Sequence, residues 1–172
     1  MKTVVVLGMH RSATSLVAKA LAGEIHMGDD LLPPTWDNPH GHWENRRFVD
    51  LNDRIIKAAG GTWRAPPSIA SINEVAPQFD EEIKTTLAEE GQGRDLWGWK
   101  DPRTTLTVRL YVPHLVNPHF VACFRDPREV AASLAMRSKG NFDTSPMSPQ
   151  LALQVARVYN HRLVGFLSEW AL

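Results

Sequence analysis

The sequence predicts an α/β protein of three layers, in which a parallel β-sheet is flanked by helices. The prediction rests on three short apolar runs, each followed by a turn and a helical pattern: Thr3–Leu7, Leu96–Trp99 and Phe120–Phe124. Strands that alternate with helices favour a parallel sheet with right-handed crossovers. A length of 172 residues is typical of one domain, which we expect to span residues 1–172.

The first unit places a phosphate-binding loop between a strand and a helix. The β-branched run Thr3–Leu7 is too short for anything but a buried strand, and apolar residues recur at helical spacing from Leu16 until Gly23 supplies a stop. In the turn Gly8–Ser15, backbone N–H groups and the positive end of the helix dipole converge, which makes an anion site of the P-loop-like type. Arg11 adds a full charge there. Further hydroxyl donors are Ser12, Thr14 and Ser15.

This loop differs from the Walker A motif, G-x-x-x-x-G-K-S/T. The positions of the second glycine and of the lysine hold Ala13 and Thr14, so the lysine that contacts the β- and γ-phosphates is absent. The cation stands earlier in the loop, at Arg11. A P-loop kinase for a small molecule is therefore disfavoured, but it stays open as an alternative.

Two irregular stretches and two helices come before the second strand. Gly28–Trp43 is rich in Pro, Asp, Asn and His, and unstructured loops of this length in compact domains are usually functional. Glu44–Ala59 has the pattern of a helix, and a second irregular stretch runs from Gly60 to about Pro77. Apolar residues at helical spacing then predict a helix over Phe79–Gly91.

The remaining two strands share one design. Each apolar run leads into a basic residue and then Asp-Pro-Arg, as Lys100–Arg103 and as Arg125–Arg128, with a helix behind it. We expect the Asp to cap that helix and the Pro to take its first position. The final helix begins at Ser148 and Pro149, and its apolar stripe, which ends at Trp170, is expected to be core.

Three cations are predicted to meet at one edge of the sheet. Arg11, Lys100 and Arg125 all stand at or just after the carboxyl end of a strand. In parallel sheets ligands bind beyond these ends, and three helix N-termini point to the same edge. The pattern indicates a site for a ligand with several negative charges.

Composition argues against several classes of function. The chain has 19 basic and 19 acidic side chains and a formal net charge of zero, so a broad basic face for nucleic acid is not expected. No apolar run approaches the length of a membrane span. The single cysteine, Cys123, cannot form an intrachain disulfide, and the N-terminus leads straight into a strand with no room for a signal peptide. We therefore expect a soluble, cytoplasmic protein without nucleic-acid partners; its oligomeric state is left open.

These motifs resemble those of the sulfotransferases that use 3′-phosphoadenosine-5′-phosphosulfate, and the resemblance covers residues 3–137. The family's loop after the first strand reads Lys/Arg-Ser-Gly-Thr-Thr/Ser, and Arg11–Ser15 stands in its place. In the family an Arg that closes a later strand and a Ser eight residues on hold the 3′-phosphate, and Arg125 and Ser133 have this spacing. Lys100–Pro102 is similar to the Lys-Asp-Pro of tyrosylprotein sulfotransferases, whose lysine helps at the reaction centre.

The resemblance implies in-line transfer of a sulfuryl group to a hydroxyl or amine, without a metal. Arg11 would stand beside the oxygen that bridges phosphorus and sulfur, where charge builds, and Lys100 would contact the sulfuryl oxygens or the bridge. An ion pair with a nearby acid is the alternative for Lys100, and packing against the sheet is the alternative for Ser133. The donor-binding residues implied are Arg11, Ser12, Ala13, Thr14, Ser15, Arg125 and Ser133.

The acceptor must lose a proton, and the loop before the second helix holds the best bases. Glu44 is the first candidate, followed by His42 and His40, and burial would raise the pKa of Glu44 towards the range useful for proton abstraction. Charge pairing at the helix N-terminus is the alternative for Glu44. His-x-His also suggests a metal, but no Cys and no third ligand accompany it, so no metal is expected.

The acceptor itself is a small molecule, a glycan or a peptide, because the loops carry no signature that narrows the choice. Two roles stay open for the tryptophans Trp36, Trp43, Trp63 and Trp97. They form an apolar or sugar-stacking wall for the acceptor, or they pack in the core. Two departures from the family stand out. Ala13 replaces a Gly that supplies a positive φ, and the family's glycine-rich C-terminal segment has no counterpart. They suggest a further alternative, a nucleotide-binding module without turnover.

Overall fold

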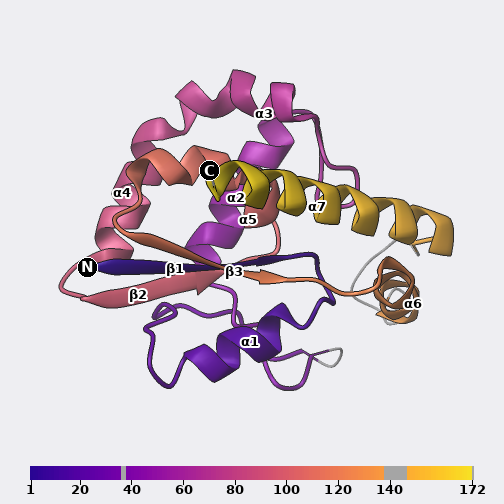
Figure 1. Ribbon diagram of the computed structural model, residues 1–172, viewed down its shortest axis with the longest axis horizontal. Coiled ribbons are helices and arrows are strands. Elements are labelled where there is room, and N and C mark those ends of the chain that lie inside the picture. The colour runs from indigo at the N-terminus through magenta and orange to yellow at the C-terminus, as the bar shows by residue number, and fades with distance from the viewer. Residues whose placement is uncertain (36–37, 138–146, 172) are drawn as a thin grey trace.

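The computed structural model describes residues 1–35, 38–137 and 147–171. At its centre is a three-stranded parallel sheet in the order β2–β1–β3 (Figure 1). The strands are Lys2–Gly8 (β1), Leu96–Lys100 (β2) and Pro118–Cys123 (β3). The register sets Val6 of β1 opposite Lys100 on one side and Val121 on the other, so the three strands end at the same edge of the sheet.

Side chains of the middle strand, β1, alternate between two apolar layers. Val5 and Leu7 belong to the larger core, while Val4 and Val6 belong to a smaller core between the sheet and α1. All four are buried, as expected for a parallel strand that is covered on both faces. Gly98 on β2 lets the strands approach, because a Cβ there would lie 2.0 Å from the carbonyl oxygen of Val4.

The helices are distributed unequally over the two faces of the sheet (Figure 1). Helix α1 (Thr14–Leu21) lies on one face, and α6 (Pro127–Arg137) packs beside the last helix, beyond β3. The opposite face carries α2 (Arg46–Ala58), α3 (Ile69–Val75), α4 (Asp80–Gly91), α5 (Thr104–Tyr111) and α7 (Pro149–Trp170). Two 3₁₀ turns follow α3 and α5, at Ala76–Gln78 and Val112–His114.

An aromatic cluster holds α2 and α5 against β2. The rings of Phe48 and Trp99 stack with their centroids 4.2 Å apart, and Trp97 and Tyr111 pack beside them. All four are buried, and full burial of such a side chain contributes about 1.5–3 kcal/mol to folding. The cluster fixes α2 on the sheet, and with it the chain segment that leads into α2.

The predicted α/β class and parallel sheet are confirmed, while one helix was missed. The stretch from Gly60 to Pro77 was expected to be irregular, but α3 lies within it. Its N-cap is Ser68, whose hydroxyl accepts a hydrogen bond from the backbone N–H of Ser71 at 3.0 Å. The two prolines before Ser68 concealed this start, because Pro-Pro usually marks a loop.

Two helix starts also differ from the prediction. Helix α2 begins two residues later than expected, because the side chain of Asn45 caps it by accepting from the backbone N–H of Arg47. Pro102 lies in a turn ahead of α5, so the prediction that it takes the first helical position is wrong. The equivalent Pro127 is the first residue of α6, as predicted.

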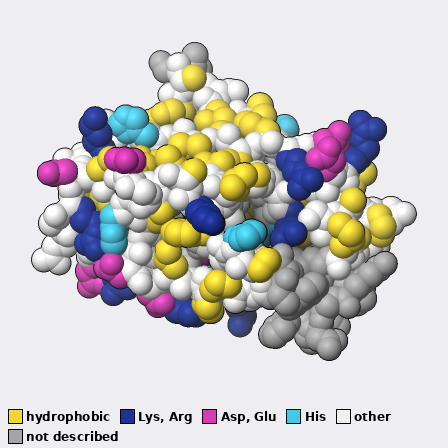
Figure 2. Space-filling model, turned by 90° about the horizontal axis from the view of Figure 1, so that it is seen from below, with side chains coloured by type: hydrophobic (Ala, Val, Ile, Leu, Met, Phe, Trp, Pro, Cys, Tyr) yellow, Lys and Arg dark blue, Asp and Glu magenta, His cyan; other side chains and the backbone are white. Residues whose placement is uncertain are grey.

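Charged and apolar side chains are interspersed on the face seen from the α1 side (Figure 2). Basic and acidic side chains occur as neighbours there, and the described part of this face carries no continuous basic surface. None of the helices in the described ranges combines the length and the apolarity that a bilayer crossing requires.

Candidate functional site

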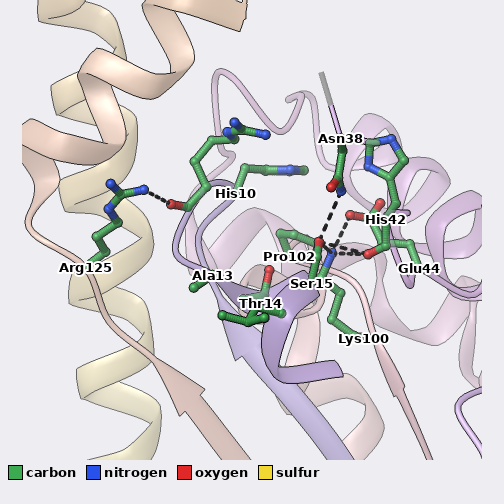
Figure 3. Close-up of a pocket in the computed structure, with 12 residues that line it drawn as sticks. His10, Ala13, Thr14, Ser15, Asn38, His42, Glu44, Lys100, Pro102 and Arg125 are labelled. Carbon is green, nitrogen blue, oxygen red and sulfur yellow. Dashed lines mark hydrogen bonds and ion pairs between the residues drawn. The ribbon is translucent and has the colours of Figure 1, made fainter. Parts of the chain in front are cut away.

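A cavity of about 230 Å³ opens at the carboxyl ends of the strands. Its walls come from the β1–α1 loop, the first turn of α1, the segment before α2, and the turns after β2 and β3. Figure 3 shows the start of α1 at its floor, Arg125 on one side, and Asn38, His42 and Glu44 on the other. The cavity therefore lies at the edge where the sequence predicts that three cations meet.

Two residues of the β1–α1 loop have left-handed backbone conformations. Arg11 has a φ of 68° and Ala13 a φ of 63°. Left-handed residues within a tight turn direct neighbouring N–H groups to one side, which forms a concavity for an anion. Ala13 adopts the conformation that glycine supplies in the related loops, with a methyl group in place, at a cost of about 1–2 kcal/mol.

The start of this loop is fixed by a contact that the sequence did not indicate. The hydroxyl of Thr105 on α5 accepts from the N–H of Gly8 at 2.9 Å and donates to its carbonyl oxygen at 3.3 Å. A Cβ on Gly8 would lie 2.6 Å from the carbonyl oxygen of Cys123. Only glycine fits between β1 and β3 at this point, and α5 holds the point where the loop begins.

On one side of the cavity Arg11 connects Arg125, which lines the cavity, to Ser133, which does not. The Arg11 guanidinium donates through Nε to the hydroxyl of Ser133 at 2.8 Å, and Arg125 donates through Nη1 to the Arg11 carbonyl oxygen at 3.0 Å. Arg125 also pairs with Glu129 one turn along α6, at 2.8 Å. The Arg125 side chain is 40% exposed, so its charge faces water beside the cavity.

On the other side, Lys100 is bound by three acceptors. Its ammonium donates to Glu44 Oε1 at 2.7 Å, to the His42 carbonyl oxygen at 2.9 Å and to Ser15 Oγ at 3.1 Å. Lys100 is 1% exposed, and an ammonium has three donors to place. The alternative role of Lys100, an ion pair with a nearby acid, is therefore present. Lys100 also lines the cavity.

The pKa of Glu44 moves in the direction opposite to the expected one. Burial alone raises it, but the charges of Lys100 and Arg103 outweigh burial and hold the pKa below its ordinary value. The expectation of a raised pKa is thus wrong, because the sequence did not indicate that two cations lie against this carboxylate. Glu44 also precedes Asn45, the N-cap of α2, and its carboxylate pairs with Lys100 and Arg103.

Arg103 is a site residue to which the sequence assigned no role. Its Nη1 lies 3.5 Å from Glu44 Oε2 and donates to Asp101 Oδ1 at 2.8 Å. Its Nε lies 2.7 Å from Asp53 Oδ1 on α2. Arg103 is therefore placed among three carboxylates, and their charges raise its own pKa despite the opposing effect of burial. The signal was present in the repeated Asp-Pro-Arg, of which only the first two residues were interpreted.

Asn52 on α2 anchors the deeper end of this network. Its amide nitrogen donates to Asp101 Oδ2 at 2.8 Å and to Thr104 Oγ1 at 3.0 Å. Its carbonyl oxygen accepts from Thr107 at 2.6 Å and from the Tyr111 hydroxyl at 2.9 Å. Asp101 is fully buried, and burial raises its pKa against the opposing charge of Arg103. The network binds α2, α5 and the turn after β2 into one rigid support.

The histidines His10, His40 and His42 occupy different places relative to the cavity. His42 lines the cavity, and its Nε2 lies 2.8 Å from the hydroxyl of Thr35. His40 is exposed and does not line the cavity. His10, which the sequence did not single out, is buried at the cavity with its ring 4.6 Å from that of Trp63. Within the described ranges no three His, Cys, Asp or Glu side chains gather in a way that could hold a metal ion.

The tryptophans named for an acceptor wall do not form one in the described residues. Trp97 is buried in the core, Trp63 packs against that core, and Trp43 packs against the smaller core below the sheet. None of these three lines the cavity. Trp36 lies outside the described residues.

A family model described as "Sulfotransferase family" matches residues 3–172. This range extends beyond residues 3–137, from which the resemblance was drawn, and it includes α7. A search of curated proteins finds no match.

Proposed function

The chain belongs to the sulfotransferase family, and we propose that it transfers a sulfuryl group from 3′-phosphoadenosine-5′-phosphosulfate to a hydroxyl or amine of an acceptor. The observation that carries the proposal is the convergence of Arg11, Lys100 and Arg125 at one cavity, above a loop that directs N–H groups into it. A donor with phosphate, sulfate and 3′-phosphate groups needs such a set of separate cations.

The donor is held by the loop and by the side of the cavity that carries Arg125. Arg125 and Ser133 take the 3′-phosphate, and their contacts with Arg11 support this assignment because they place all three within one cluster. The N–H groups of Ala13, Thr14 and Ser15 and the hydroxyls of Ser12 and Thr14 take the 5′-phosphosulfate, since the Ser12 N–H already donates to the Met9 carbonyl oxygen and the Ser15 hydroxyl to that of His42. The hydroxyl of Ser12 supports this role, because it is buried and has no hydrogen-bond partner among the described residues.

The transfer moves one SO₃ unit and one proton. The bond between sulfur and the bridging oxygen breaks, the acceptor oxygen or nitrogen bonds to sulfur, and 3′-phosphoadenosine-5′-phosphate leaves with the bridging oxygen. Arg11 stabilises the charge that builds on that oxygen, and Lys100 exchanges one of its three hydrogen bonds, to Glu44, His42 or Ser15, for one to the sulfuryl group. Removal of one such donor typically lowers the rate by about 10²–10³. Because these cations supply the charge, the proposed transfer is independent of a metal.

The acceptor proton goes to Glu44. Its lowered pKa keeps it ionised at neutral pH, so it is always able to accept a proton, although it is a weaker base than a carboxylate with a raised pKa. His42 on the same side of the cavity is the alternative base. The acceptor is a small molecule, a glycan or a peptide.

Calorimetry with purified protein tests the donor. We expect 3′-phosphoadenosine-5′-phosphate to bind tightly without metal and ATP to bind weakly even with Mg²⁺, because Thr14 stands at the place of the Walker lysine. Tighter binding of Mg·ATP would favour the kinase. Mass spectrometry of metabolites, glycans and peptides incubated with the donor tests transfer. Nucleotide binding without any sulfated product would favour the module without turnover.

A further inference from the structure

Arg103 takes no part in the proposed transfer, yet it is the second cation on the carboxylate of Glu44. Lys100 binds Oε1 of that carboxylate at 2.7 Å, and Arg103 Nη1 lies 3.5 Å from Oε2. The two cations therefore hold the carboxylate from both of its oxygens. Glu44 is 5% exposed, so no bulk water replaces either of them.

Arg103 supplies the second positive charge beside the two buried carboxylates, Glu44 and Asp101. Lys100 comes from β2, Asp101 and Arg103 from the turn before α5, Asp53 from α2 and His42 from the same loop as Glu44. Asp101 is a second buried carboxylate, and Arg103 Nη1 contacts both acids. Without Arg103, Glu44 and Asp101 would face each other with only Lys100 to offset them.

The two Asp-Pro-Arg turns share a backbone bond but place their Arg side chains differently. The matching turn at Arg128 has the same local bond, from the Arg128 backbone N–H to Asp126 Oδ1 at 2.7 Å, against 3.2 Å from Arg103 N–H to Asp101 Oδ1. Yet the Arg128 side chain is 85% exposed, whereas that of Arg103 is 13% exposed. A turn with the same Asp–Arg backbone bond thus forms where the Arg side chain contacts no second acid among the described residues, so the contact of Arg103 with Glu44 goes beyond what this bond needs.

We propose that Arg103 is a positioning residue for sulfuryl transfer, which acts through Glu44 by fixing its carboxylate between two cations and so placing the Lys100–Glu44 pair at the cavity. This inference rests on the proposed function, because it gives that pair a part in the transfer. Asp101 and Asn52 in turn hold the Arg103 guanidinium through the bonds that run from α2 to the turn.

The first experiment does not depend on turnover. Carboxyl ¹³C NMR follows the titration of Glu44 in the full chain, with its signal assigned by Glu44→Gln. In Arg103→Met we expect Glu44 to titrate at higher pH than in the wild type, since one of its two cations is gone, and Arg103→Lys should restore much of the difference. Arg128→Met is the matched control and should titrate like the wild type.

The second experiment separates kcat from donor affinity. Arg103→Met should lower kcat by about 10²-fold, the usual effect of a misplaced reacting group, while the affinity for 3′-phosphoadenosine-5′-phosphate changes less than about twofold. Arg103→Lys should recover part of kcat, and Arg128→Met should keep all of it. If Arg103→Met does not fold, Arg103→Lys decides: relative to the wild type it should raise the pH of the Glu44 titration and lower kcat, each by less than expected for Arg103→Met.

An unchanged Glu44 titration, or an unchanged kcat, in folded Arg103→Met would overturn the inference; where Arg103→Met does not fold, the same result in Arg103→Lys would do so. A different result marks failure of the proposed function alone. If the wild-type protein sulfates nothing while Arg103→Met still shifts the Glu44 titration, the interaction of Arg103 with Glu44 is supported and the proposed reaction is contradicted.

Discussion

Lys100–Arg103 and Arg125–Arg128 are two turns of nearly the same sequence in two different surroundings. In each turn the Asp accepts from the backbone N–H of the Arg two residues on, and it also lies beside the side chain of that Arg. Around Lys100 the basic and acidic groups are buried. Around Arg125 they are exposed. The same local structure therefore produces a sealed ion-pair network at one strand end and open cations at the other.

The difference comes from what covers each turn. The segment before α2 lies over Lys100, so Glu44 and the His42 carbonyl oxygen supply acceptors that replace water. At Arg125, α7 contributes the amide of Asn160, which lies 3.5 Å from the Arg125 carbonyl oxygen. A buried charge must be paired to be tolerated, whereas an exposed one is screened and remains available to a ligand. Burial, rather than the motif, thus decides which cation is fixed and which can bind phosphate.

Glu44→Gln tests the sealed turn, which is Lys100–Arg103 with its buried partners, most severely. Turnover should fall by about 10²–10⁴, the usual worth of a positioned base, because the amide keeps the shape but neither the charge nor the basicity. Donor affinity should survive. Measurement of kcat and of nucleotide affinity checks both. Glu129→Gln, which removes the exposed carboxylate beside Arg125, is the control and should keep turnover. Near-normal turnover in Glu44→Gln, with a loss in His42→Ala, would move the base to His42.

Lys100→Met should affect both activity and stability. We expect kcat to fall by about 10²–10³ and the free energy of unfolding to fall by about 3–5 kcal/mol, because Glu44 is left as a buried, poorly compensated charge. Urea denaturation measures the second effect. The double variant Lys100→Met/Glu44→Gln should regain much of the lost stability. If the double variant is no more stable than Lys100→Met, the ion pair is not what holds this turn together.

Arg125→Ala should give the opposite pattern at the exposed turn Arg125–Arg128: donor affinity should fall while stability hardly changes. Loss of a charged hydrogen bond to a phosphate weakens donor binding by about 1.5–3 kcal/mol, and Ser133→Ala should act in the same direction. The free energy of unfolding should change by less than about 0.5 kcal/mol, as for most exposed positions. Calorimetry and urea denaturation measure the two quantities. Arg128→Ala is the control for affinity, and equal losses in both variants would remove Arg125 from the 3′-phosphate site.

The smallest expected effect is a pH dependence of stability that belongs to the sealed turn. The pKa of folded Glu44 is lowered from 4.5, so its stabilisation is complete above pH 4.5 and is lost as the pH falls through the lower folded-state value. The raised pKa of Asp101 acts with the opposite sign. The difference in unfolding free energy between wild type and Glu44→Gln should therefore shrink below pH 4.5. A difference that stays constant down to pH 3 would contradict the pairing.

The sequence was sufficient for the sheet and for the meeting of the cations, because both follow from local patterns and from the common edge of parallel strands. It was not sufficient for Arg103 or Asn52. Their roles depend on contacts between α2 and the turn after β2, such as the Asn52–Asp101 bond across 49 residues. The pKa of Glu44 was predicted in the wrong direction for the same reason, since Lys100, 56 residues away, and Arg103 together outweigh burial.

The three bonds of Lys100 also have a consequence for the order of folding. They join β2 to partners 85, 58 and 56 residues earlier in the chain, at Ser15, His42 and Glu44. Contacts across such separations form only after the loop-closure entropy of the intervening chain has been overcome. Until β2 docks beside β1, Glu44 has no Lys100 and stays in water. The sealed side of the cavity is therefore assembled late, and a partly folded chain that already holds the β1–α1 loop would still lack it.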